Sequence, residues 1–372
     1  MSARFLTAVS GRAFNMRDRF GREIDYMRIS VIDSCNLNCY YCNPQDNNKN
    51  CQAINILSVK KVLCIVRAAT RLGITHFRLT GGEPLLHPQI DEMVSQIKKI
   101  PGVRSVSLTT NAVLLAQHAK QLKEAGIDSI NVSLDTIDAS EYEHITKKPL
   151  LHKVEQGIDA AIECGIRVKI NAVLTPQTDV VALTRYASKK GTDIRFIEMM
   201  PVGEGHTNGV EPYEKVIGAL LEVYGTPCHI DTENREEINS GYNNSDNGPA
   251  EYYSFHGLNI RVGLIQAIHG KFCDTCNRIR VTADGRLMPC LGSSVTMDLV
   301  PDSCEFTDDL EKDFVIVQAL KAAIKAKPGC HNFNDNAVTY TKTTETKTVE
   351  TKNTELKAAE VNAARNMSRI GG

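Results

Sequence analysis

The sequence predicts an α/β protein built on a parallel sheet, and two recurring features between residues 26 and 200 indicate it. Six short segments have the β-branched character of buried strands, at 26–32, 75–80, 104–110, 128–135, 167–174 and 193–200. The helical stretches between them end at glycines that close a helix in the left-handed conformation, namely Gly73, Gly126, Gly165 and Gly191. Because right-handed crossovers join such repeats, we expect a partial (βα)6 barrel of the TIM type.

The rhythm changes after residue 201. Residues 231–248 are polar and rich in Asn and read as a loop, whereas 252–261 and 279–287 read as β segments and 309–327 as a helix. The run Ala283-Asp284-Gly285-Arg286 predicts a hairpin turn that folds Cys290 back towards Cys273 and Cys276.

Composition narrows the function. The chain of 372 residues is 42% apolar with a net charge of −1, which argues against global affinity for nucleic acid, and it has no apolar run long enough to span a membrane. Its 12 cysteines, without a secretory signal, fit a reducing compartment and metal ligation. We therefore expect a cytoplasmic protein. The arginine-bearing, acid-free first 17 residues leave a mitochondrial matrix location as the alternative.

Two sets of three cysteines carry the strongest signal. Cys35, Cys39 and Cys42 form C-x3-C-x2-C after the first predicted strand, and Cys273, Cys276 and Cys290 form C-x2-C-x13-C. Three thiolates can hold a four-iron, four-sulfur (4Fe–4S) cluster and leave its fourth iron open for a ligand. A closed structural zinc site is the alternative, but it needs four ligands, and the nearest further cysteine to the first set is Cys51.

Other motifs fall at the carboxyl ends of the predicted strands, where barrel enzymes carry their chemistry. The run Gly81-Gly82-Glu83-Pro84 follows the second strand, and Thr109 to Asn111 close the third. Cys-x3-Cys-x2-Cys followed by Gly-Gly-Glu-Pro resembles the radical S-adenosylmethionine superfamily. We interpret the two glycines as letting the backbone approach the methionyl end of the cofactor.

The second cysteine set, in Phe-Cys273-Asp-Thr-Cys276-Asn-Arg278-Ile-Arg280, resembles the molybdenum cofactor biosynthesis protein A family of GTP 3′,8-cyclases, as does the run from Asp18 to Ser30. The resemblance covers about residues 18–328 and resumes at the last few residues. It implies two 4Fe–4S clusters and S-adenosyl-L-methionine as cofactors. An adenosyl radical would take the 3′ hydrogen of GTP, giving (8S)-3′,8-cyclo-7,8-dihydroguanosine 5′-triphosphate, in the first step of molybdenum cofactor biosynthesis.

The resemblance also implies roles for single residues. The positions that match S-adenosylmethionine contacts are Tyr41, Gly82, Ser133 and Met200. Those that match GTP contacts are Arg22, Arg78, Thr109, Lys169, Arg278 and Arg280. From the residues alone, Arg78 and Lys169 lie in apolar strands, where an unpaired charge is costly, so they favour an anionic ligand in the barrel. Arg22, Ser133 and Met200 taken alone would read as a surface arginine, a strand-end cap and a core methionine.

We expect an N-terminal extension at 1–17 and a radical S-adenosylmethionine partial barrel at 18–225. A C-terminal β-containing region at 226–334 would carry the second cluster, followed by a flexible tether at 335–365 and a tail at 366–372. The resemblance implies that the tail, ending in Gly371 and Gly372, reaches the active site. The chain departs from the family pattern at Ser34, Asn43 and Ala112.

The expected partners are GTP, an electron donor such as a flavodoxin or ferredoxin, and a downstream cyclic pyranopterin monophosphate synthase, with a homodimer left open. The sequence leaves two alternative functions open. One is a radical enzyme that modifies a peptide or protein and carries an auxiliary cluster, and the other is a cluster-bearing electron-transfer or scaffold protein.

Overall fold

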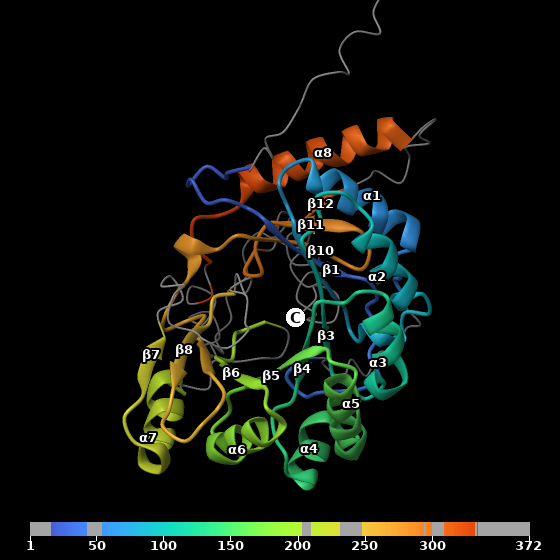
Figure 1. Cartoon of the computed structure of the whole chain (residues 1–372). Coiled ribbons are helices and arrows are strands. Elements are labelled where there is room, and N and C mark those ends of the chain that lie inside the picture. The colour runs from blue at the N-terminus through green and yellow to red at the C-terminus, as the bar shows by residue number, and fades with distance from the viewer. Residues whose placement is uncertain are drawn as a thin grey trace, which may run out of the picture.

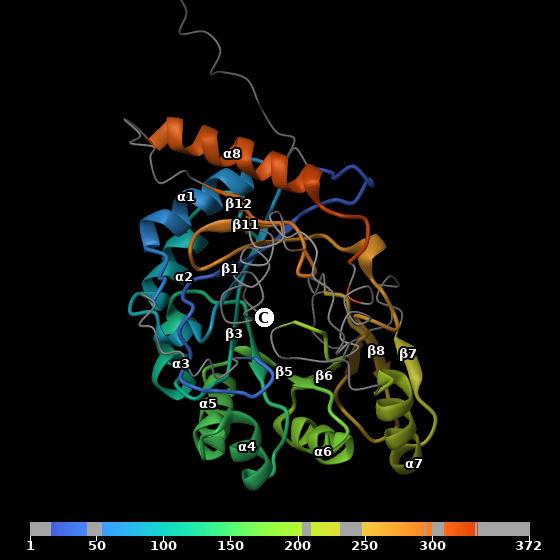
Figure 2. The same cartoon turned by 180° about the vertical axis from the view of Figure 1, so that it is seen from behind.

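The computed structural model describes residues 16–42, 54–202, 210–230, 248–293, 295–299, 309–331 and 333. The six predicted β–α units are present. Their strands are β1 (Tyr26–Ser30), β2 (His76–Thr80), β3 (Ser105–Thr110), β4 (Ser129–Ser133), β5 (Arg167–Val173) and β6 (Asp193–Ile197), each parallel to the next. The helices between them are α1 (Val59–Thr70), α2 (Ile90–Lys98), α3 (Leu115–Glu124), α4 (Ala139–Thr146), α5 (Leu151–Glu163) and α6 (Val180–Lys190), with a 3-10 turn at Pro84–Leu86. Figures 1 and 2 show the sheet curling with these helices on its outer side.

The C-terminal region extends this sheet at both edges. Strand β10 (Arg278–Val281) pairs in parallel with β1, and β9 (Val262–Ile265) pairs in parallel with β6. Antiparallel strands follow on each side, namely β11 (Arg286–Met288), β12 (Met297–Asp298), β8 (Glu251–Ser254) and β7 (Cys228–Ile230). Within the described residues the order is β12-β11-β10-β1-β2-β3-β4-β5-β6-β9-β8-β7. The barrel is therefore open, and the expectation of six parallel strands is extended by one strand on each side.

The single β segment predicted at 252–261 is wrong. The amide of Leu258 donates to the carbonyl of Phe255, and Gly257 has a φ of +80°, so the chain turns there and β8 and β9 form an antiparallel pair. The hairpin predicted at 283–286 is confirmed, with Gly285 at a φ of +86° between β10 and β11.

The remaining helices are α7 (Ala219–Tyr224), preceded by a π-helical turn at Glu214–Gly218, and α8 (Asp309–Ala326), which agrees with the predicted helix at 309–327. Helix α8 packs against α1 and also contacts β11 and β12, so it lies on the outer side of the sheet near its β12 edge in both views (Figures 1 and 2). The four glycines predicted to close helices all have positive φ. Among the described residues, no helix combines the length and apolar character needed to cross a bilayer.

Each central strand has two different faces. Met27 and Ile29 of β1 are fully buried, like Phe77 and Leu79 of β2, and these side chains belong to the apolar core shared with the helices. Alternate residues point to the opposite side of a strand. That side carries polar and charged residues, including Arg28, Arg78, Ser107, Thr109, Asn131, Lys169, Asn171 and Arg195. The concave face of the sheet is therefore a polar, strongly cationic surface.

Candidate active site

The first cysteine set lies in the loop after β1, and the Gly-Gly-Glu segment holds that loop in place. The amide of Gly82 donates to the carbonyl of Ile32 at 2.8 Å, and the amide of Glu83 donates to the carbonyl of Ser34 at 2.8 Å. A Cβ on Gly81 would lie 2.2 Å from the carbonyl oxygen of Ile32, and one on Gly82 would lie 2.2 Å from that of Ser34. The sequence-based interpretation of these glycines therefore needs correction, because what the missing Cβ atoms admit is the backbone of the cysteine loop.

Glu83 connects this loop to the end of β3. Its carboxylate is fully buried and accepts hydrogen bonds from the Thr110 hydroxyl at 2.7 Å and from the amides of Asn111 and Leu85 at 2.8 and 3.0 Å. The side chain of Asn111 in turn donates to Asn36 at 2.7 Å and to the Cys35 sulfur at 3.8 Å. These hydrogen bonds thus join the end of β2 to the end of β3 beside Cys35.

The three thiols of this loop perturb one another. Burial raises the pKa of Cys35 to about 11 and that of Cys42 to about 12, and the negative charge of a neighbouring thiolate adds to the shift in Cys42. The pKa of Cys39 is raised by burial and then by Asp135, Cys42 and Cys35. Three close, partly buried thiols are a donor set that a cationic iron cluster suits, because bound metal ions favour the thiolate form.

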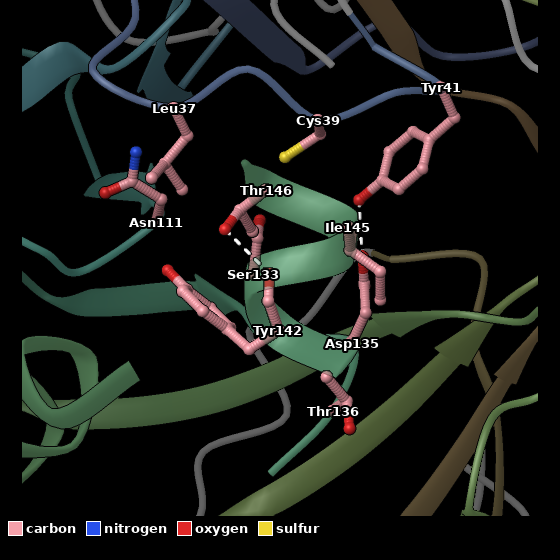
Figure 3. A pocket seen from close by; sticks show the side chains of 10 residues that line it. All are labelled: Leu37, Cys39, Tyr41, Asn111, Ser133, Asp135, Thr136, Tyr142, Ile145 and Thr146. Atoms are coloured by element: carbon pink, nitrogen blue, oxygen red, sulfur yellow. Dashed lines mark hydrogen bonds between the residues drawn. The ribbon is translucent and has the colours of Figure 1, made fainter. Parts of the chain in front are cut away.

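A pocket opens between the cysteine loop and the end of β4, lined by Leu37, Cys39, Tyr41, Asn111, Ser133, Asp135, Thr136, Tyr142, Ile145 and Thr146 (Figure 3). It brings together three predicted site residues: the cluster ligand Cys39 and the cofactor residues Tyr41 and Ser133. The Tyr41 hydroxyl donates to Asp135 at 2.5 Å, and the other oxygen of Asp135 accepts from the Val173 amide at 2.8 Å. Ser133 is exposed at the rim, whereas the carboxylate of Asp135 is engaged by Tyr41 and Val173.

The other two predicted cofactor residues do not line this pocket. Gly82 faces the carbonyl of Ser34, as described above. Met200 packs beside a small apolar cluster of Val202, Met288 and Phe333. The role of both residues towards S-adenosylmethionine stays a prediction.

A row of three arginines crosses the concave face. In the strand register Arg280 of β10 lies beside Arg28 of β1, and Arg28 lies beside Arg78 of β2. Burial and the charges of Arg280, Arg78 and Arg278 together hold the pKa of Arg28 well below its usual range. Like charges at adjacent positions of a sheet destabilise it. This row therefore indicates a site for a polyanion.

A second row lies one step along the face and contains Thr109, Asn131 and Lys169 at paired positions. Lys169 is 1% exposed, and burial, followed by repulsion from Arg195, lowers its pKa to about 6. The Thr109 hydroxyl oxygen and the Asn131 side-chain nitrogen are buried and have no hydrogen-bond partner among the described residues. Buried polar atoms of this kind are costly unless a ligand meets them.

Sequence reasoning found the ends of these rows and missed their centres. Arg78, Arg280, Thr109 and Lys169 were predicted, whereas Arg28 and Asn131 were not. The signal was present, because Arg28 occupies the same place in Tyr-Met-Arg-Ile-Ser as Arg78 does in His-Phe-Arg-Leu-Thr.

The second cysteine set surrounds the start of β10. Cys273 begins a 3-10 turn, Cys276 precedes Arg278 by two residues, and the pairing of Arg280 with Met288 returns the chain so that Cys290 comes back beside this turn. Here the charges differ from those of the first set. Burial raises the pKa of Cys276, but Lys327 and Arg278 outweigh it, and the net pKa is lowered. Among the described residues, no group of three or more His, Cys, Asp or Glu side chains is arranged to hold a single metal ion.

Arg22 is engaged within the protein. Its guanidinium donates to the Asp18 carboxylate at 2.7 Å and to the carbonyls of Cys273, Pro328 and Gly329 at 2.6, 2.6 and 3.1 Å. All five of its N–H groups have partners once the second contact with Asp18 at 2.6 Å is included. The structure places Arg22 as a brace behind the second cysteine turn, and its contact with GTP stays a prediction.

Several expectations lie outside the described residues, namely the loop at 231–247, Asn43, the tether at 335–365 and the tail with Gly371 and Gly372. Ala112, in contrast, lies within the described residues. It adopts a φ of +62°, which Gly would adopt without strain, and its amide donates to the Thr110 hydroxyl at 2.9 Å. The carbonyl of Ser34 accepts the hydrogen bond from the amide of Glu83.

Comparisons with known proteins agree with this geometry. A model of the radical SAM superfamily matches residues 29–183, and a model described as Molybdenum Cofactor Synthesis C matches residues 192–333. The fold and the first cysteine loop thus define a radical S-adenosylmethionine enzyme. A GTP 3′,8-cyclase of Clostridium perfringens (strain SM101 / Type A) is 36% identical over 322 residues, covering 86% of this chain and 95% of that protein. Another, from Listeria monocytogenes serovar 1/2a, is 36% identical over 320 residues, covering 85% and 92%. The chain belongs to the GTP 3′,8-cyclase family.

The solved structures support the fold. Streptococcus suis SuiB bound to S-adenosylmethionine has a TM-score of 0.54 at 16% identity and covers 82% of this chain and 68% of that one. The same protein bound to its precursor peptide SuiA has a TM-score of 0.53 at 17% identity and covers 82% and 67%. At this identity the likeness shows the architecture alone, so it does not favour the peptide-modifying rival.

Proposed function

We propose that this chain closes a bond between C3′ and C8 of GTP, giving (8S)-3′,8-cyclo-7,8-dihydroguanosine 5′-triphosphate, which makes it a lyase at the first step of molybdenum cofactor biosynthesis. Family membership supports the substrate. The observation that carries the proposal is the row of Arg280, Arg28 and Arg78 beside the second cysteine set. Three adjacent guanidinium groups match the charge of a triphosphate, and each can bind a phosphate in a bidentate fork.

Membership of the radical SAM superfamily implies one 4Fe–4S cluster and S-adenosylmethionine. Cys35, Cys39 and Cys42 would hold this cluster, and the pocket with Tyr41 and Ser133 adjoins it. When bound, these cofactors supply the one-electron chemistry that removes a hydrogen atom from the ribose. The protein's own part is to fix the loop through Glu83 and Asn111 and to keep Tyr41 in place through Asp135.

We further propose a second 4Fe–4S cluster at Cys273, Cys276 and Cys290, whose open iron would face the guanine. These three thiols suit such a cluster, because the hairpin returns Cys290 to the other two. Burial lowers the pKa of Arg280 to about 10, and the charges of Cys290 and Cys276 partly offset this shift, so both thiols lie near that guanidinium. A nucleotide held there would extend its phosphates over the arginine row, towards Lys169 and Thr109. The buried, unpartnered Nε of Arg278, as far as the described residues go, adds a donor at the same place.

The product as proposed is an isomer of GTP, since the hydrogen atom that leaves C3′ in 5′-deoxyadenosine is replaced by one electron and one proton added to the ring system. Each turnover therefore needs two external electrons, one to cleave S-adenosylmethionine and one to reduce the ring radical, and we propose a flavodoxin- or ferredoxin-like donor for both. A cyclic pyranopterin monophosphate synthase would consume the product. A cytoplasmic location and a homodimer remain proposals of the same kind.

The test is anaerobic reconstitution followed by iron and sulfide counting, then incubation with dithionite, S-adenosylmethionine and either GTP or ATP. The proposal predicts about eight irons, 5′-deoxyadenosine formation that depends on GTP, and a product with the mass of GTP. Deoxyadenosine formed while GTP stays intact would contradict the cyclase activity and favour the peptide-modifying rival. No cleavage of S-adenosylmethionine at all would favour the electron-transfer rival.

A further inference from the structure

A buried lysine at the end of α8 has no part in the proposed reaction. Lys327 follows Ala326, the last residue of α8, and is 2% exposed. Its ammonium donates to the carbonyl of Arg278 at 2.8 Å, to the carbonyl of Pro289 at 3.1 Å and to the Cys276 sulfur at 3.4 Å. These three partners use all three N–H groups of the ammonium.

The three partners belong to the two segments that carry the second cysteine set. Cys276 and Arg278 lie at the start of β10, and Pro289 directly precedes Cys290 after β11. One cation therefore joins both arms of the hairpin at the point where the cysteines emerge. Removing it leaves two carbonyls and a sulfur without this donor, and an unsatisfied buried acceptor lowers the free energy of unfolding.

The two cysteine sets differ in this respect. In the described residues Cys35 accepts hydrogen bonds from the amide of Leu37 at 3.5 Å and from the Asn111 side chain at 3.8 Å, and both donors are neutral. Cys276 accepts from a cation. Positive charge and hydrogen bonds at the sulfur ligands stabilise the reduced form of an iron–sulfur cluster and raise its potential.

We infer that Lys327 is a positioning residue for the second cluster, which holds the segments of Cys276 and Cys290 together and raises the reduction potential of the cluster bound there. This inference rests on the proposed second cluster. It gives the two cysteine sets different electrostatic surroundings, since a cation donates to Cys276 and neutral groups donate to Cys35.

The second cluster can be measured alone in the full chain when Cys35, Cys39 and Cys42 are all replaced by Ala. In this background we would compare Lys327→Met, Lys327→Gln, Lys327→Arg and the control Lys325→Met, which removes an exposed lysine from the same helix. The readouts are iron content after anaerobic reconstitution and the midpoint potential from an electron paramagnetic resonance titration, with circular dichroism to check folding.

Lys327→Met should lose half or more of the bound iron. Lys327→Gln removes the charge and keeps two N–H donors on a side chain one bond shorter, so it should retain more iron than Lys327→Met while its potential shifts downward. Lys327→Arg should restore most of the iron and the potential, and Lys325→Met should match the parent. A parent that binds about four irons while Lys327→Gln shows an unchanged potential would overturn the inference about Lys327 alone. A parent that binds no iron would contradict the proposed second cluster itself, and the inference with it.

Discussion

Lys169 is a residue whose burial lowers the stability of the fold, as expected of the GTP contact proposed for it. It is buried, and its folded pKa of about 6 lies well below its unfolded value of 10.5. Between these values the unfolded chain binds more protons, so this residue's contribution to the free energy of unfolding rises with pH and is least favourable near pH 6. This cost to the fold supports the proposal that Lys169 binds an anionic ligand.

Replacing Lys169 by Met should raise the free energy of unfolding by about 2 kcal/mol near neutral pH, because a buried amine is exchanged for an apolar side chain of similar length. The gain should be larger at pH 6 than at pH 9. Urea unfolding at both values measures it, with Lys153→Met, at an exposed position of α5, as the control. A variant less stable than the parent at pH 6 would contradict this account of Lys169.

The same variant should bind GTP about 10- to 100-fold more weakly, the loss expected for one charged hydrogen bond. Because an anion favours the charged lysine, GTP binding to the parent at pH 8 should take up a proton that the variant does not take up. Calorimetry in two buffers of different ionisation enthalpy measures this uptake. Equal proton uptake by parent and variant would count against a phosphate contact by Lys169.

Ala112 and Lys147 are two non-glycine residues with positive φ, at +62° and +61°. A left-handed conformation costs a residue with a Cβ about 1–2 kcal/mol. Lys147→Gly should therefore raise the free energy of unfolding by about 1 kcal/mol, and Ala112→Gly by less, because Ala112 is fully buried and its methyl group is lost. Thermal unfolding checks both, and a loss of more than 1 kcal/mol in either variant would contradict the assigned strain.

At the scale of elements, the cysteine loop and the Gly-Gly-Glu segment behave as one unit. Gly82→Ala places a Cβ 2.2 Å from a backbone oxygen of that loop, which must then move. We expect the variant to lose the first cluster and to fall from about eight irons to about four. Gly218→Ala is the matched control, because nothing lies within 4 Å of a Cβ there, and it should keep all its iron. Full iron content in Gly82→Ala would show that the loop tolerates displacement.

The elements also show what sequence could predict. The strand–helix order, the glycine-terminated helices and the hairpin at 283–286 followed from period and turn chemistry, and all are present. The break between β8 and β9 was missed because Phe255 to Arg261 keep an apolar character through a turn. Arg28 was missed although its strand matches that of Arg78 in pattern, whereas Asn131 was missed because its significance depends on its register with β3 and β5, which is not local information.

Arg22 is a residue whose tertiary contacts could not be predicted from the sequence. Family resemblance predicts a GTP contact, whereas the structure fills every donor of this side chain with Asp18 and three backbone carbonyls. Its partners come from segments about 250 and 300 residues away in sequence. A brace of this kind depends on tertiary packing that no local pattern reveals.

At the scale of the whole molecule, one sheet unites the two halves of the site. Strands β10 and β9 from the C-terminal region pair with β1 and β6 at opposite edges of the barrel, so the second cysteine set and the arginine row belong to the same concave surface. The two family models divide the chain, but the hydrogen-bonded sheet crosses their boundary. The architecture therefore places the proposed cofactor pocket and the cationic face, proposed to bind the substrate, on one curved sheet.

The central claim is that this chain directs radical chemistry to the ribose of GTP, and an isotope measurement tests it most directly. The reconstituted protein is incubated with dithionite, S-adenosylmethionine and GTP that carries deuterium at C3′, and the mass of the 5′-deoxyadenosine is measured. The account predicts a gain of one mass unit with the C3′ label and none with a C2′ label. Unlabelled deoxyadenosine from the C3′-labelled substrate would contradict it.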